Sequence, residues 1–118
     1  MDQFQLQTIV GATGVCILQV NGPFTLQNVF EFQNLARKEC ERAIIVDLTG
    51  APYMDSAGLG AILGIFASCQ RTQRGFAVAG ACGRVQTLLQ VAKADHILSL
   101  FETVEAAESR LSAKAQQA

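Results

Sequence analysis

The amino-acid sequence predicts a single α/β domain built on one mixed sheet. After an initial pair of strand-length segments, apolar strands alternate with amphipathic helix-length segments, which is the element order of an α/β domain. The chain has 118 residues and half of them are hydrophobic, so one core can form without disulfides or metal ions. We expect one domain over residues 1–118, with a frayed tail at 113–118 because that segment has no apolar periodicity.

Two strands are expected to open the domain as a hairpin. Phe4–Val10 begins with an alternation of apolar and glutamine side chains, which indicates a half-exposed strand. A glycine-containing turn at 11–14 leads to Val15–Val20, which is more continuously apolar. The pattern therefore favours an antiparallel pair at the start of the sheet.

A helix and a central strand are expected next. Asn21-Gly22-Pro23 ends the second strand, and Thr25 is placed to cap a helix from about Leu26 to Glu41 with a broad apolar face. Ala43–Leu48 is apolar on both faces, which indicates a strand at the centre of the sheet under helices.

The second half of the chain continues the alternation of strands and helices. A helix is expected from about Ala57 to Gln70, a short strand at Phe76–Ala79 and a third helix at Arg84–Lys93. Ile97–Phe101 fits either a short edge strand or an extended connection, and a last helix is expected at Val104–Leu111.

The stretch Asp55-Ser56-Ala57-Gly58-Leu59-Gly60 carries the strongest functional signal. It follows the central strand and opens a helix, so Ser56 is placed at or beside a helix N-terminus, where free N–H groups and the helix dipole favour negative charge. Small residues at 57, 58 and 60 leave the hydroxyl accessible. The alternative is that Asp55 or Ser56 serves only as an N-cap, a common role for both residue types.

The segment from Ile44 to Phe66 resembles the STAS domain, in particular the anti-sigma-factor antagonist family. The resemblance extends more loosely over residues 4–112, and its specific part is the loop. It implies a four- or five-stranded mixed sheet with helices mainly on one side, and Ser56 as a site of phosphorylation supported by Asp47. The matching positions are Asp47, Asp55, Ser56, Gly58, Leu59 and Gly60.

The resemblance also implies a function. The unphosphorylated protein would bind an anti-sigma factor that is also a serine protein kinase, releasing a sigma factor. Phosphorylation of Ser56 adds a charge of about −1.5 to −2 and would switch binding off, and a phosphatase would restore it. The alternative is a constitutive scaffold or accessory STAS module of a signalling or lipid-transport complex. A third and less specific alternative is a small anion- or nucleotide-binding domain, and the resemblance leaves room for weak nucleotide contact.

The helix after the loop has two faces. Leu59, Ile62, Leu63 and Phe66 form a core stripe, while a second surface is small and uncharged. That second surface either docks on the partner, which we favour, or is covered by a neighbouring helix of the chain. The expected partner-binding residues are Asp55, Ser56, Ala57, Gly58, Gly60, Ala61, Gly64, Ile65 and Ser68.

Composition and spacing argue against several other classes of protein. The longest apolar run, Ala57–Cys69, is shorter than the roughly 20 residues of a membrane span. The net charge is −1, which offers no footprint for nucleic acid, and the scattered cations are expected on solvated faces (Arg37, Lys38, Arg71, Arg74 and Arg84). With no basic and apolar leader at Met1–Phe4, we expect a cytoplasmic protein.

No catalytic, metal or cofactor site is expected. Ser56 lacks the preceding glycine of a nucleophile elbow, since Met54 occupies that position, and the single histidine, His96, offers no evident relay. The four cysteines have irregular spacing and are expected to be buried thiols (Cys16, Cys40, Cys69 and Cys82). These features favour a binding module over an enzyme.

Overall fold

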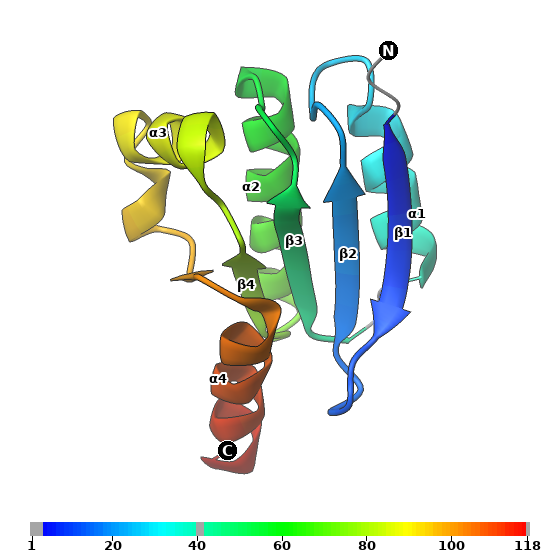
Figure 1. Ribbon diagram of the computed structural model, residues 1–118. Coiled ribbons are helices and arrows are strands. Elements are labelled where there is room, and N and C mark those ends of the chain that lie inside the picture. Colours follow the sequence, from blue (N-terminus) through cyan, green and yellow to red (C-terminus); the bar gives the residue numbers. More distant parts are fainter. Residues whose placement is uncertain (1–3, 40–41, 118) are drawn as a thin grey trace.

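Five strands form one mixed sheet in which the order in space follows the order in the chain (Figure 1). The computed structural model describes residues 4–39 and 42–117. The first two strands pair antiparallel and all later neighbours pair in parallel. The strands are β1 (Gln5–Val10), β2 (Cys16–Asn21), β3 (Ile44–Gly50), β4 (Phe76–Ala79) and β5 (Leu100–Phe101).

Three helices share one face of the sheet because each parallel crossover advances by one strand in the same direction. Crossovers of one hand then place their helices on one side. A single core joins this face to α1 (Val29–Glu39), α2 (Ser56–Arg71) and α3 (Gly83–Val91). A 3₁₀ helix, η1 (Ala94–His96), follows α3, and α4 (Val104–Gln117) crosses the opposite face (Figure 1). The expected arrangement, with helices mainly on one side, is confirmed.

The two faces of the sheet differ in the size of their cores. In β2 and β3, alternate residues such as Leu18 and Val46 point to the large core under α1 and α2, and both are fully buried. Their neighbours Ile17 and Ile45 point to the smaller core, which Ala107 of α4 closes. This alternation explains why the central strand reads as apolar on both faces.

The first helix begins later than the sequence predicts. α1 starts at Val29, not Leu26, and Asn28 rather than Thr25 precedes it, its carbonyl oxygen accepting from the Phe32 N–H at 3.2 Å. The reason is tertiary: the residues before Asn28 bond to the loop ahead of α2, as described below. The expected end at Glu41 lies outside the described residues.

Two C-terminal features also differ from the expected boundaries. The segment with an ambiguous pattern contains a two-residue edge strand, β5, and α4 continues to Gln117 instead of ending near Leu111. Val104, Ala107 and Leu111 form the stripe by which α4 packs on the sheet. No large apolar residue follows Leu111 in the sequence, which is why the apolar pattern did not predict the rest of the helix.

The expectation of four buried thiols is wrong in two places. Cys16 is disulfide-bonded, and Cys82 is an exposed free cysteine at the start of α3. Cys69 is a buried free thiol, as expected, and Cys40 lies outside the described residues. Spacing along the chain did not predict the disulfide because bonding depends on which strands and turns the fold brings together.

Candidate functional site

The candidate site is the connection from β3 to α2, which ends in the N-cap residue Asp55. Asp55 has an extended backbone, and its Oδ1 accepts a hydrogen bond from the Gly58 N–H at 3.0 Å. The Leu59 N–H donates to the Asp55 carbonyl oxygen at 3.1 Å. The N-cap alternative therefore holds for Asp55, and Ser56 is the first residue of α2.

A second loop holds this connection in place. Phe24 forms an isolated parallel bridge with Met54, in which the Phe24 N–H donates to the Tyr53 carbonyl oxygen and the Asp55 N–H donates to the Phe24 carbonyl oxygen. The other carboxylate oxygen of Asp55, Oδ2, accepts from the Leu26 N–H at 3.1 Å. One carboxylate thus ties the start of α2 to the segment before α1.

Ser56 is presented outward at the tip of this connection. The residue is exposed, and its hydroxyl makes no hydrogen bond to any residue that the structure describes. As the first residue of a 16-residue helix, it lies where backbone N–H groups and the positive end of the helix dipole favour an anion. The site can therefore accept a negatively charged group at Ser56 without unfolding α2.

Gly58 is required by close packing at the base of the loop. A Cβ added there would lie 2.5 Å from the Phe24 carbonyl oxygen and 2.8 Å from the Met54 Cγ. Gly60 and Gly64 differ, because a Cβ on either would meet nothing within 4 Å. Gly58 thus allows the paired loops to pack closely, whereas Gly60 and Gly64 leave the outer surface of α2 open.

The expected partner-binding residues do not form one continuous surface. Gly58 and Ala61 are buried, so their inclusion as partner contacts is corrected: Gly58 lies under Phe24, and Ala61 lies in the core beside α1. Ile65 is partly buried against that core. Ser68 lies at the far end of α2, where its Oγ accepts from Arg74 Nη2 at 3.2 Å. Asp55, Ser56, Ala57 and Gly60 remain together at the loop end.

Asp47 supports the end of β3 and not the serine directly. It is buried, and its Oδ1 accepts from both the N–H and the hydroxyl of Thr49, at 3.0 and 2.6 Å. These bonds shape the last residues of the strand before the loop begins. Asp47 therefore shapes the end of β3, which precedes the Ser56 loop in the chain.

The structure adds residues that the sequence did not indicate. The Arg84 guanidinium lies over the Tyr53 ring, 4.6 Å from its centroid, and links the start of α3 to the loop. Leu26, whose N–H bonds to Asp55, is 65% exposed, and Phe30, in the first turn of α1, is 72% exposed. A topological signal existed for Arg84, because residues that follow neighbouring parallel strands meet at one sheet edge.

The single histidine, His96, lies on η1 after α3. The His96 side chain is 82% exposed on η1, with its Nε2 3.9 Å from Asp95 Oδ1. Among residues 4–39 and 42–117, no group of three histidine, cysteine or acidic side chains could hold a metal ion. No helix in the described part of the chain is long and apolar enough to cross a bilayer.

Comparison with known proteins identifies the family of this domain. The STAS domain family matches residues 7–107, which is most of the chain, so the chain belongs to the STAS family. An anti-sigma factor antagonist from Mycobacterium paratuberculosis superposes with a TM-score of 0.82 at 15% identity, covering 93% of this chain and 95% of that one. The antagonist SpoIIAA in its unphosphorylated form gives 0.67 at 16% identity, covering 93% and 98%.

The same fold occurs as part of a larger protein. The murine Solute Carrier 26 family member A9 anion transporter matches with a TM-score of 0.72 at 14% identity, covering 96% of this chain but 22% of that one. At these identities the likeness shows a shared fold. The function therefore has to be argued from the site.

Proposed function

We propose that this chain is an anti-sigma-factor antagonist whose binding to an anti-sigma factor is switched off by phosphorylation of Ser56. The observation that carries the proposal is the exposed Ser56 hydroxyl at the first position of α2. The anti-sigma factor would also be the serine kinase, and a phosphatase would restore the binding form. The protein would act in the cytoplasm, where sigma factors and their regulators meet.

The switch is electrostatic. A phosphoryl group would add about −1.5 to −2 charge next to the Asp55 carboxylate, at a point where α2 itself tolerates an anion. The fold would survive while a closely packed partner would meet an unmatched charge. A loss of tenfold or more in affinity corresponds to only about 1.4 kcal/mol, which a charge of this size readily supplies at an interface.

The docking surface would lie around the loop end of α2. Ser56, Ala57 and Gly60 provide a low surface there. The Asp55 bond holds the exposed Leu26 next to the loop, and the exposed Phe30 follows four residues later in the first turn of α1. Large apolar residues beside a small smooth surface are the usual core of a protein interface. Gly64 would extend this surface along α2, whereas Ser68 lies too far along the helix to share it.

The first test is site-specific phosphorylation. Incubation with the anti-sigma kinase and ATP should add one phosphoryl group, and Ser56→Ala should abolish the reaction. Ser99→Ala is the matched control, because Ser99 is also exposed but lies outside the loop. Mapping of the phosphoryl group to another hydroxyl would overturn the proposal.

The second test separates docking from stability. Phe30→Ser should weaken binding to the anti-sigma factor about tenfold or more, measured by calorimetry, with an unchanged melting temperature. Val10→Ser is the control, because Val10 is 77% exposed on the edge strand β1. Equal effects of the two changes would argue against a docking surface at the loop.

A constitutive STAS module is the second candidate. The match to one part of a larger transporter supports it, since there the fold is a component of a multidomain protein. In that case Ser56 would stay unmodified, and Ser56→Ala and Ser56→Asp would bind partners of a signalling or lipid-transport complex equally well. Co-purification followed by comparison of these two variants distinguishes the candidates.

A further inference from the structure

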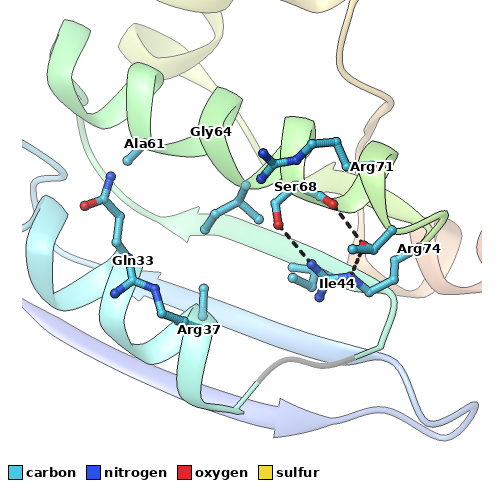
Figure 2. Close-up of a pocket in the computed structure, with 11 residues that line it drawn as sticks. Gln33, Arg37, Ile44, Ala61, Gly64, Ser68, Arg71 and Arg74 are labelled. Carbon is cyan, nitrogen blue, oxygen red and sulfur yellow. Dashed lines mark hydrogen bonds between the residues drawn. The ribbon is translucent and has the colours of Figure 1, made fainter.

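A second candidate site lies at the opposite end of α2 from Ser56. A groove of about 680 Å³ runs between α1 and α2, near the C-terminal end of each helix (Figure 2). This volume is within the range of about 300–1,000 Å³ that small-molecule sites occupy. The groove is lined by residues from both helices, from the start of β3 and from the turn that follows α2.

Small side chains keep the groove open. Ala36 of α1 and Ala61 of α2 are buried at its base, and Ile65 adds an apolar wall. Gly64 borders the groove without a side chain, and a Cβ there would meet nothing within 4 Å. Above the two buried alanines, Ile65 and the open position at Gly64 therefore offer an apolar surface to a ligand.

Three arginines surround this apolar base. Arg37 comes from α1, Arg71 from α2 and Arg74 from the following turn, and all three line the same groove (Figure 2). Arg74 is held in position, since its Nε donates to Thr72 Oγ1 at 2.7 Å and its Nη2 to Ser68 Oγ at 3.2 Å. No carboxylate is among the described residues that line the groove.

Cations at helix C-termini often serve only to complement the helix dipole. Here the last carbonyl groups of α2 are already bonded by backbone and hydroxyl donors: Thr72 bonds to the Ser68 oxygen, Gln73 to Gln70 and Arg74 N–H to Cys69. Arg71 is not used as a cap. Like Arg37, it makes no ion pair or hydrogen bond with the residues that the structure describes. Both guanidinium groups keep their donors available.

We propose that the α1–α2 groove binds a small phosphate monoester. Its phosphate group is held by the arginines, and its apolar body lies against Ile65 and the open position at Gly64, above the alanine base. Guanidinium groups suit this role because their paired N–H donors match two oxygens of a phosphate. An anion without an apolar body would use only half of the groove.

The test uses 1-naphthyl phosphate as the probe, with inorganic phosphate and 1-naphthol as comparison ligands, on the full chain without any partner. Calorimetry should show binding of 1-naphthyl phosphate at least about tenfold tighter than either comparison ligand. In amide NMR spectra, the largest shifts should fall on Gly64 and Ser68. Equal binding of inorganic phosphate and 1-naphthyl phosphate, or shifts centred elsewhere, would overturn the proposal.

Single substitutions test which residues contact the phosphate group and which contact the apolar body of the ligand. Arg37→Gln and Arg71→Gln should each weaken 1-naphthyl phosphate about tenfold, whereas Lys38→Gln, one residue along α1 and outside the groove, should not. Gly64→Met should fill the groove and exclude 1-naphthyl phosphate while inorganic phosphate binds as before. If Lys38→Gln weakens binding as much as the arginine changes, the effect is one of net charge and the site is refuted.

Discussion

The charged side chains at the two ends of α2 differ in how far they are hydrogen-bonded to the rest of the protein. At the N-terminal end, the Asp55 carboxylate is fully engaged, with one oxygen bonded to Gly58 and the other to Leu26. At the C-terminal end, two of three arginines in the groove have no bond to a described residue. The helix dipole favours the sign of charge found at each end of α2. The Asp55 carboxylate is therefore used for structure, so its removal should lower stability, whereas changes at Arg37 and Arg71 should alter ligand binding with little effect on stability.

The largest expected effect is at Gly58, in the paired loops. Gly58→Ala should lower the free energy of unfolding by about 1–3 kcal/mol, because the new Cβ overlaps a backbone carbonyl oxygen that cannot move freely. Gly60→Ala is the matched control and should raise stability by up to about 1 kcal/mol, since the position is open and alanine favours helix. Urea denaturation measures both, and equal shifts would contradict the assigned packing.

Removal of the Asp55 carboxylate should have the next largest effect. Asp55→Ala should cost about 1–2 kcal/mol, the usual penalty for a lost N-cap with the added loss of the Leu26 bond. Asp55→Asn should cost less because an amide oxygen can still cap the helix. Amide hydrogen exchange at Leu26 should be faster in the alanine variant because its N–H loses the Asp55 acceptor. An unchanged exchange rate would show that the bond between Leu26 and Asp55 does not protect this amide in solution.

At the arginine end, Arg74 and Arg71 should differ. Arg74→Gln should cost about 0.5–1.5 kcal/mol because its side chain bonds to Thr72 and Ser68. Arg71→Gln should leave the melting temperature nearly unchanged. If Arg71→Gln destabilises the protein as much as Arg74→Gln, Arg71 has a structural role and the contrast between the ends fails.

The smallest expected effect is that of a negative charge at Ser56. Ser56→Asp should change stability by only about 0.3–1 kcal/mol, in the stabilising direction, since a carboxylate at a helix start is favourable. The gain should disappear in 1 M salt, where the Debye length falls to about 3 Å. A large drop in melting temperature would mean that the hydroxyl is structurally buried.

Local patterns were enough to predict the strand, loop and helix around Ser56. Strand-length and helix-length periodicities identified β3 and α2, and the residues between them determined the position of the serine. The pairing of Phe24 with Met54 was missed because no pattern links segments so far apart in the chain. That pairing also shifted the start of α1. The arginine groove was missed because Arg37, Arg71 and Arg74 look like scattered surface charges until α1 packs on α2.

The buried state of the cysteines was predicted only in part, because it also depends on how the elements pack together. Burial raises the pKa of the Cys69 thiol, an effect that the nearby Arg74 charge partly offsets. Its burial followed from the expectation that the cysteines are buried thiols. The exposure of Cys82 did not, because it precedes α3 at a turn whose orientation depends on the whole sheet.

The position of α4 has a consequence for how the protein is made. This helix follows all five strands in the chain, yet among residues 4–39 and 42–117 it is the helix that covers the face carrying Ile45, Ala77 and Ala79. During synthesis, therefore, the sheet can assemble under α1 and α2 while its other side is still bare to the surrounding solution. Chaperones that recognise apolar strands would bind the sheet during that interval, which ends when Ala107 has left the ribosome and packs on the sheet.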